Sequence, residues 1–256
     1  MIPLPAWWDG PADGPTNMAA DEILAAEALD RGCPVVRFYG WTRSTVSLGA
    51  FQPLTALADT DVGGLPIVRR PSGGGAIVHG NDLTYAAAVP RSHAWGGAAQ
   101  SLYDALHATL ADALVARGIP ARLHQGADGP GDAAAVLCFD RRAPGDLVLP
   151  VPGGTAAHKI MGSAQRRLGT TVLQHGSLLL RANADVGPAA RHAGLADLHE
   201  AARWPIRELA EDWLGRVAAT LGARLEFQPL PFSHGREERV IEAAQRFGDA
   251  SWTGRR

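Results

Sequence analysis

The chain has 256 residues, of which 20% are charged and 46% are hydrophobic, and its formal net charge is −2. This length and composition are ordinary for one globular domain with a sizeable core. The small net charge gives no reason to expect nucleic acid or an anionic membrane surface as a partner. Two cysteines do not make a disulfide framework, and we expect neither a signal peptide nor a membrane-spanning segment. We therefore expect a cytoplasmic protein.

Three segments have the hydrophobic periodicity of amphipathic helices, and a last helix is expected near the end of the sequence. The first should begin near Thr16 or Asn17, which are both plausible N-caps, and end before Gly32. The stripes of leucine in these segments are typical of helices that pack against a core. The predicted helices are Thr16–Leu29, Leu102–Leu114, Pro205–Leu221 and Arg236–Arg246.

Short apolar runs separated by glycine and proline predict strands between these helices. Since the strands come in groups, we expect an α/β (α+β) sandwich with a mixed or mostly antiparallel sheet and flanking helices. Residues 127–135 are rich in Gly, Ala and Asp and are interpreted as a loop. The predicted strands are Val35–Tyr39, Thr45–Leu48, Pro66–Arg69, Ala76–His79, Leu83–Val89, Leu147–Val151 and Ser177–Leu180.

Lysine is almost absent from the chain. Lys159 is the only lysine, and the other 23 of the 24 basic residues are arginines. Lysine is a compact point charge on a slim stem, whereas arginine is a wide planar fork, so Lys159 is a candidate for a position where arginine cannot serve. A surface lysine that has survived by chance is the alternative.

Three segments have the composition of a ligand site. The first is a Ser-Gly-Gly-Gly turn, preceded by two arginines, whose glycines allow a ligand to approach the backbone. The second has small residues directly after Lys159, and the third has polar residues before an apolar run. In the simplest alternative, these are ordinary hairpin turns. The candidate residues are Arg69, Arg70, Ser72, Gly73, Gly74, Gly75, His79, Gly162, Ser163, Ala164, Gln174, His175 and Gly176.

The order of these segments resembles the lipoate–protein ligase A and octanoyltransferase family. The matching motifs are Arg-Arg-x-Ser-Gly-Gly-Gly-Ala, Lys-Ile-x-Gly-Ser-Ala-Gln-Arg-Arg and Leu-Gln-His-Gly-Ser-Leu-Leu-Leu. The resemblance implies the biotin/lipoate ligase catalytic domain over residues 1–230, with residues 231–256 as a C-terminal helix and basic tail of the same domain. It also implies that Lys159 is the active-site lysine and that the candidate residues above bind substrate.

A fourth segment separates two chemistries within this family. Cys138-Phe139 stands where the octanoyltransferases have their nucleophilic cysteine, whereas ATP-dependent ligases usually have Asn-Asp. The resemblance thus implies acyl transfer through Cys138 and Lys159, which should lie together at one pocket. No metal or other cofactor is expected; the expected partners are acyl carrier protein and a lipoyl domain or glycine cleavage H protein. The alternatives are a ligase that uses ATP and Mg²⁺, and a non-catalytic protein that binds an acyl group or a carrier.

Two further features bear on this assignment. Gly75 stands where many such transferases have arginine. Three arginine pairs lie in or beside the candidate segments, and we expect them to form a positive rim at the mouth of the pocket. The pairs are Arg69-Arg70, Arg141-Arg142 and Arg166-Arg167.

Overall fold

The computed structural model describes residues 1–126, 135–151 and 156–255. Within these ranges, the centre of the fold is an eight-stranded sheet with the order β11-β1-β2-β6-β10-β9-β8-β7. β1 is parallel to β2 and β11, and the other neighbours are antiparallel. The strands are β1 (Ile2–Ala12), β2 (Val35–Trp41), β6 (Asp82–Pro90), β7 (Arg122–Leu123), β8 (Leu147–Pro150), β9 (Ala157–Leu168), β10 (Thr171–Leu179) and β11 (Ala223–Phe227).

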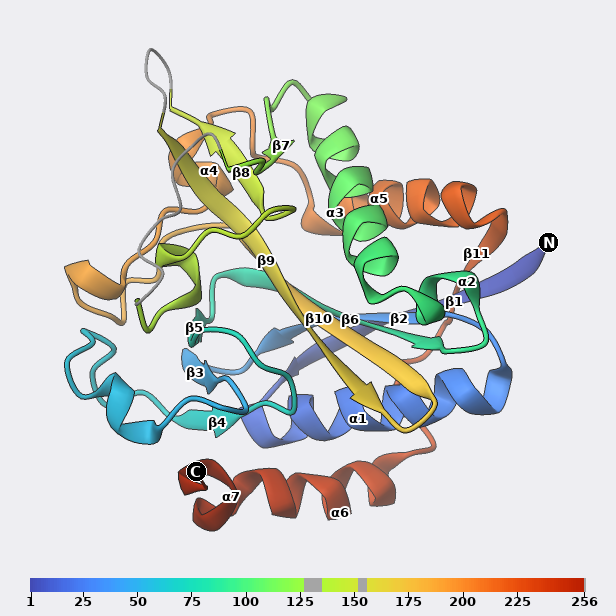
Figure 1. The fold of residues 1–256 in the computed structure, drawn as a ribbon, viewed down its shortest axis with the longest axis horizontal. Helices are drawn as coiled ribbons and strands as arrows, with labels where there is room; N and C mark the ends of the chain where they lie inside the picture. The colour runs from blue at the N-terminus through green and yellow to red at the C-terminus, as the bar shows by residue number, and fades with distance from the viewer. Residues whose placement is uncertain (127–134, 152–155, 256) are drawn as a thin grey trace.

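A smaller sheet with the order β4-β3-β5 lies beside the large one (Figure 1). It consists of β3 (Thr45–Leu48), β4 (Ile67–Arg69) and β5 (Ile77–His79). The segment between β4 and β5 contains the glycine turn. The small sheet thus holds this turn beside β9, where a Cβ atom at Gly74 would lie 3.8 Å from Ala164 Cβ.

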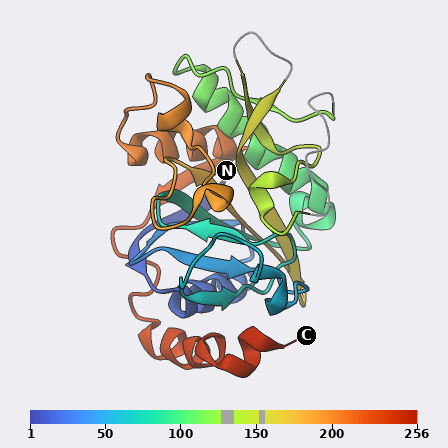
Figure 2. The same ribbon diagram turned by 90° about the vertical axis from the view of Figure 1, so that its left-hand side faces the viewer.

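Helices cover both faces of the large sheet (Figures 1 and 2). α3 and α5 pack on each other and on one face, where Leu106, Leu110 and Trp213 are buried. α1 packs against β6 and β10 on the other face, and α6 lies outside α1. The helices are α1 (Gly14–Arg31), α2 (Ala94–Gly97), α3 (Ala99–Val115), α4 (Leu195–Leu198), α5 (Ile206–Leu221), α6 (Glu237–Gly248) and α7 (Ala250–Gly254), with single 3₁₀ turns η1 (Leu54–Leu57), η2 (Cys138–Asp140) and η3 (Pro188–Ala190).

The sequence of β6 reflects its burial on both faces. Leu83 and Tyr85 belong to the core beneath α3 and α5, whereas Ala86 and Ala88 belong to the core beneath α1. Successive side chains of a strand point to opposite faces, so a central strand with two covered faces is apolar throughout. No helix among the described residues is long and apolar enough to cross a bilayer.

The predicted mixed, mostly antiparallel sheet with flanking helices is confirmed. The start of α1 differs from the prediction, because Asp13 is the N-cap and its carboxylate accepts a hydrogen bond from the N–H of Thr16 at 2.9 Å. Asn17 instead donates its side-chain amide to the carbonyls of Ala12 and Gly40. Asn17 therefore joins α1 to β1 and β2.

β1, β7, β9 and β11 are absent from the predicted strands, and β10 begins at Thr171 rather than at Ser177. The first half of β10 is hard to recognise from the sequence, because the polar residues Gln174 and His175 lie inside the strand and are 0% and 6% exposed. Their burial is stabilised by hydrogen bonds and not by apolar packing, so they lack the pattern of a core strand. The predicted loop at 127–135 lies outside the described residues apart from Ala135.

Candidate active site

The glycine turn and the loop that carries Cys138 are joined through their backbones. Cys138 donates its N–H to the carbonyl of Ala76 at 2.7 Å, and Ala76 donates to the carbonyl of Val136 at 2.9 Å. A Cβ atom at Gly75 would lie 2.9 Å from the backbone nitrogen of Cys138. A side chain at this position would separate the two segments. Glycine at position 75 therefore allows their close contact.

A β-bulge in β9 sets the direction of Lys159. Leu147 pairs with Met161 but Val148 pairs with Lys159, so β9 contains one extra residue at this point. Bulges of this kind redirect side chains and are frequent beside active sites. The lysine side chain crosses over Gly162, where a Cβ atom would lie 2.7 Å from its Cε and 2.8 Å from its Nζ. Gly162 thus leaves the space that Lys159 occupies.

The ammonium group of Lys159 joins Cys138 to Asp146. Its Nζ lies 3.6 Å from Cys138 Sγ, 3.2 Å from the Cys138 carbonyl oxygen and 2.8 Å from Asp146 Oδ2. Burial opposes the charge of Lys159, but the neighbouring Cys138 and Asp146 outweigh this effect and raise the pKa of Lys159 above its ordinary value. The expected proximity of Cys138 and Lys159 is confirmed, with the lysine held as a cation.

Asp146 is fixed from three directions. Its Oδ1 accepts a hydrogen bond from the hydroxyl of Tyr103 at 2.9 Å, and its Oδ2 accepts one from the N–H of Ala143 at 2.7 Å in addition to the Lys159 contact. Tyr103 belongs to α3, and burial together with Asp146 raises the pKa of its phenol. Neither residue is among the sequence-predicted candidates. The sequence could have indicated Asp146 by its position directly before β8, the strand that pairs with β9 and its Lys159.

Arg70 supports the glycine turn through hydrogen bonds to its carbonyl groups. Its guanidinium is 3% exposed and donates to the carbonyls of Ser47, Gly73 and Gly75, each at 2.7 Å. Burial lowers the pKa of Arg70 to about 10, so the group remains charged at neutral pH. The C=O and N–H of a trans peptide point in opposite directions. Because the Gly73 carbonyl points at Arg70, the N–H of Gly74 in the same peptide points away from it.

Arg69 binds backbone carbonyls of two distant segments at once. Its side chain is fully buried and donates to the carbonyls of Gly49 at 2.9 Å and Gln52 at 2.6 Å. Two further donors of the same guanidinium reach the carbonyl of Thr253 at 2.6 and 2.9 Å, and Trp252 Nε1 donates back to the Arg69 carbonyl at 3.0 Å. The C-terminal helix α7 is therefore tied to the strand that leads into the glycine turn.

The predicted rim of three arginine pairs is wrong in most of its parts. Arg69 and Arg70 are buried, because backbone carbonyls accept their hydrogen bonds. Arg141 and Arg142 are half-buried and donate to the carbonyls of Ala135 and Ala157 respectively, but both line the open cleft beside Cys138, as predicted. Only the third pair, Arg166 and Arg167, is exposed.

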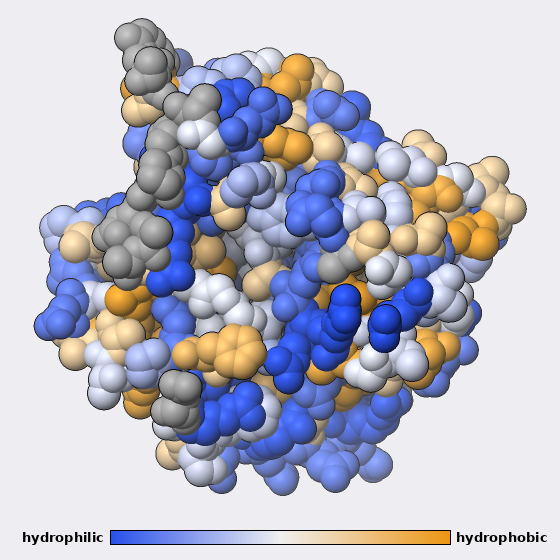
Figure 3. Space-filling model, in the orientation of Figure 1, coloured by the Kyte–Doolittle hydropathy of each residue, from blue (hydrophilic) through white to orange (hydrophobic). Residues whose placement is uncertain are grey.

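A mostly apolar pocket extends inward from Cys138. An open cleft lies on the other side of the thiol, and Figure 3 shows the hollow near the centre of this face. Gly74, Cys138 and Ser163 line both spaces, so the thiol stands where they meet. The pocket is also lined by Met18, Tyr39, Trp41, Ser47, Arg70, Ile77, His79, Thr84, Ala164, His175 and Gly176, and the cleft by Gly75, Gln100, Tyr103, Arg141, Arg142, Ala143, Pro144, Asp146 and Lys159.

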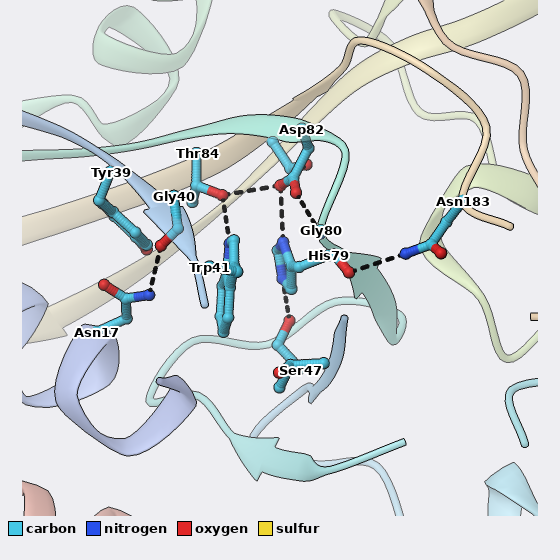
Figure 4. A network of polar contacts seen from close by, with 12 residues as sticks. Asn17, Tyr39, Gly40, Trp41, Ser47, His79, Gly80, Asp82, Thr84 and Asn183 are labelled. Carbon is cyan, nitrogen blue, oxygen red and sulfur yellow. Dashed lines mark hydrogen bonds and ion pairs between the residues drawn. The ribbon is translucent and has the colours of Figure 1, made fainter. Parts of the chain in front are cut away.

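A network of polar contacts forms one wall of the pocket (Figure 4). His79 lies between Asp82 and Ser47, with its Nδ1 2.8 Å from Asp82 Oδ2 and its Nε2 2.8 Å from Ser47 Oγ. The ring of Trp41 stacks on His79 with 4.0 Å between centroids and donates its N–H to Thr84 Oγ1 at 2.9 Å. The wall therefore presents flat ring faces to the pocket while its polar atoms bond to one another.

Asp82 anchors this network from β6. Its carboxylate accepts hydrogen bonds from Thr84, Ser177 and the N–H of Gly80, in addition to the His79 contact. Burial alone would raise the pKa of Asp82, but His79 and these donors reverse the effect and hold it below the usual range. The carboxylate is thus stabilised as an anion within the fold.

A second histidine fixes the glycine turn from the opposite side. His175 places its Nδ1 2.9 Å from Asp21 Oδ2, and its Nε2 forms a short hydrogen bond with Ser72 Oγ. Asp21 also accepts hydrogen bonds from Arg37 at 3.0 Å and from the hydroxyl of Tyr39 at 2.9 Å. These contacts join the turn to α1, β2 and β10.

A chain of ordered hydrogen bonds determines the orientation of Ser163. Burial lowers the pKa of His107 to about 4, so the ring is neutral. Its Nδ1 donates to the Gly145 carbonyl at 2.7 Å, and its Nε2 therefore accepts from Ser163 Oγ at 2.6 Å. Tyr85 then donates to Ser163 at 2.8 Å and accepts from Gln174 Nε2 at 2.6 Å. The hydroxyl proton of Ser163 thus points at His107.

The sequence-predicted residues divide into two groups. Arg70, Gly74, Gly75, His79, Ser163, Ala164, His175, Gly176, Cys138 and Lys159 line the pocket or the cleft. Arg69, Ser72, Gly73, Gly162 and Gln174 line neither space, and they support the residues that do. Among the described residues, no three His, Cys, Asp or Glu side chains are arranged to hold a metal ion.

Comparison with known proteins places this site in a family. Residues 13–198 match the lipoyl protein ligase A/B catalytic domain. The chain belongs to this family. The family resemblance seen in the motifs is therefore confirmed, and with it the membership of a family of enzymes.

Similar proteins include two bacterial octanoyltransferases. The octanoyltransferase LipM of Moorella thermoacetica is 32% identical over 274 residues, which cover 96% of each chain. The LipM of Symbiobacterium thermophilum is 37% identical over 179 residues, which cover 67% of this chain and 63% of that protein.

Solved structures with the same fold are lipoate–protein ligases. Lipoate-protein ligase A bound with ATP has a TM-score of 0.70 at 20% identity and covers 99% of both chains. A putative lipoate protein ligase from T. acidophilum with bound lipoic acid has a TM-score of 0.69 at 19% identity and covers 99% of this chain and all of that one. At this level of identity, they show the fold alone.

Proposed function

We propose that this protein is an octanoyltransferase that moves an octanoyl group from acyl carrier protein to a lysine of a lipoyl-accepting protein. Cys138 is the nucleophile, and Lys159 is its cationic partner. The position of Cys138 Sγ carries the proposal, since it lies 3.6 Å from Lys159 Nζ at the meeting point of the apolar pocket and the open cleft. The relatives named octanoyltransferase support the same reaction.

The first step acylates the enzyme. The Cys138 thiol loses its proton and its sulfur attacks the thioester carbonyl, so that a bond from Sγ to carbon forms. The carbon–sulfur bond to the carrier then breaks, and the departing carrier thiolate takes up the proton that Cys138 lost. The ammonium of Lys159 is fixed 3.6 Å from the attacking Sγ. This ammonium can also stabilise the negative charge that develops on the carbonyl oxygen.

The second step releases the acyl group to the acceptor. The acceptor lysine enters through the cleft, its neutral amine attacks the acyl-Cys138 thioester, and an amide forms as the Cys138 thiolate leaves. The thiolate recovers the proton that the amine loses, so the two steps balance without ATP, Mg²⁺ or another cofactor.

The substrate-binding residues act on separate parts of the acyl group. The pocket takes the apolar chain against Trp41, Ile77 and the ring of His79. The glycine turn and the small residues after Lys159 allow the thioester to approach the backbone.

A lipoyl domain or glycine cleavage H protein is the proposed acceptor. A solved relative with 19% identity is described as a bipartite lipoate protein ligase with its E2 lipoyl domain, from Thermoplasma acidophilum. This relative supports a lipoyl domain as the class of acceptor.

Intact-mass spectrometry tests the proposal directly. After mixing with octanoyl-carrier protein without ATP, the parent should gain one octanoyl group that hydroxylamine removes. Cys138→Ala should gain none. The matched control is Cys33→Ala, which removes the other cysteine, a buried residue, and should acylate normally.

Two outcomes would contradict the transferase. Normal octanoyl transfer by Cys138→Ala, or modification of the acceptor from free octanoate only when ATP is present, would support the ligase alternative. Binding of the carrier with no acylation and no transfer would instead support a non-catalytic protein.

A further inference from the structure

Positive side chains from distant parts of the chain gather below the active-site cleft. Arg166 lies near the end of β9, Arg246 lies on α6, and Arg255 follows α7. Arg246 and Arg255 both lie over the ring of Trp252, with 4.8 and 3.1 Å from each guanidinium carbon to the ring centroid. Burial lowers the pKa of Arg255, and the positive charges of Arg246 and Arg166 lower it further, so both groups lie within electrostatic range of Arg255. Like charges gathered on a surface raise the free energy of the protein unless an anion binds there.

Two of these arginines are available to a partner. Arg246 forms an ion pair with Glu22 at 2.7 Å. Arg166 and Arg255 are exposed and form no ion pair within residues 1–126, 135–151 and 156–255. Arg255 stacks on the ring of Trp252, with 3.1 Å between its guanidinium carbon and the ring centroid. The stacking presents the edge of the guanidinium, with its donors, to solvent.

An exposed aromatic side chain lies between these charges and the thiol. Phe51 is 69% exposed, and its ring would lie 3.5 Å from a Cβ atom at Gly73 in the glycine turn. The neighbouring carbonyl of Gln52 and the carbonyl of Thr253 in α7 accept hydrogen bonds from the same Arg69 side chain. Phe51 therefore stands between α7 and the mouth of the site. Figure 3 shows hydrophilic residues along the lower edge of the hollow on this face.

The distance from this surface to the reacting atoms is long. Arg166 follows Lys159 by seven residues along β9, and a strand rises about 3.3 Å per residue, so their backbones are roughly 23 Å apart. The acceptor presents a lysine on a short side chain and must bring its surface to the cleft itself. An acyl carrier presents its thioester at the end of a long flexible arm and can bind at a distance from the thiol.

We propose that Phe51, Arg166 and Arg255 form a docking surface for the acidic acyl carrier protein that delivers the octanoyl thioester. This inference rests on the proposed function and adds the place where the donor binds. Carboxylates on the carrier pair with the two arginines, an apolar residue of the carrier packs on Phe51, and the arm runs over the glycine turn into the cleft. Such charge pairing raises the association rate and weakens with salt.

Two octanoyl donors separate docking from chemistry. The rate of Cys138 acylation is measured by intact mass with octanoyl-carrier protein and with octanoyl-pantetheine, which has the arm but no protein. In Arg166→Glu/Arg255→Glu, kcat/KM for the carrier at about 0.05 M salt should fall at least roughly ten-fold, whereas octanoyl-pantetheine should react within two-fold of the parent. The parent rate with the carrier should fall as salt rises, and the variant rate should change little.

Matched variants complete the test. Arg203→Glu/Arg207→Glu makes the same change in net charge near the start of α5. The rate of Cys138 acylation with either donor should then equal that of the parent. Phe51→Ala should slow acylation by octanoyl-carrier protein several-fold at every salt concentration. The rate of acylation by octanoyl-pantetheine should not change.

Three results would overturn the docking surface: an unchanged carrier rate in the double variant, an equal loss with both donors, or a loss confined to transfer onto the acceptor. Failure of the parent to react with either donor would overturn the proposed function instead.

Discussion

Gly162→Ala tests whether the position of Lys159 controls the reaction. The added methyl group would lie 2.7 Å from Lys159 Cε and 2.8 Å from its Nζ. Ordinary contact between carbon atoms begins near 3.5 Å, so the end of the lysine must move by roughly 0.8 Å. It can do so without moving the backbone, because only the end of a flexible side chain is displaced. We therefore expect little loss of stability and a large loss of rate.

The size of the loss follows from the geometry. Nζ now contacts both Asp146 and Cys138 Sγ, and a shift of this size weakens both contacts. Misplacement of a catalytic group by about 1 Å costs on the order of 10²-fold in rate. The assay is single-turnover acylation of Cys138 followed by intact mass, together with thermal unfolding. Gly40→Ala is the control, because Gly40 also lies in a strand and its Cβ would meet Pro11 at an ordinary 3.7 Å. A normal acylation rate in a folded Gly162→Ala protein would refute the reasoning.

Three further predictions concern the same site. Lys159→Arg should abolish acylation while the protein still folds, because the wider guanidinium does not fit over Gly162; a near-normal rate would make Lys159 dispensable. Asp146→Asn should slow acylation by on the order of 10²-fold and move the alkaline limb of the pH–rate profile to lower pH, since Asp146 raises the pKa of Lys159; an unmoved limb would contradict this role. His107 stays neutral in the fold to about pH 4, whereas a histidine in the unfolded chain binds its proton near pH 6.5. The unfolded state thus holds more protons between these values, and the free energy of unfolding should fall by about 3 kcal/mol as pH drops from 6.5 to 4. Urea denaturation of the parent and of His107→Gln measures this, and equal slopes in the two proteins would exclude His107 as the cause.

The sequence predicts the parts of the site that depend on local pattern. Cys138, Lys159 and the glycine turn lie in ordered motifs, and the leucines of α3 have a clear helical period. The remaining parts depend on contacts between distant segments. Tyr103 reaches Asp146 across 43 residues, and the bulge that directs Lys159 has no signature in the composition of β9.

The error over the arginine pairs has a physical cause. Adjacent arginines are usually solvated, and this expectation holds for Arg166 and Arg167. Arg69 and Arg70 are instead buried, because irregular backbone around the glycine turn leaves carbonyls without partners in a helix or sheet, and guanidinium donors supply these partners. Whether a segment offers such carbonyls depends on its tertiary structure.

The bond between Arg69 and Thr253 has a consequence for the order in which the site forms during synthesis. The two residues are 184 positions apart, so the ribosome synthesises the glycine turn long before α7. Until α7 emerges, a nascent chain contains Cys138 and Lys159 but lacks the carbonyl that two donors of the Arg69 guanidinium share. The glycine turn therefore lacks one of its supports until α7 has packed against Arg69, and the last part of the site to become ordered depends on one of the last helices to be made.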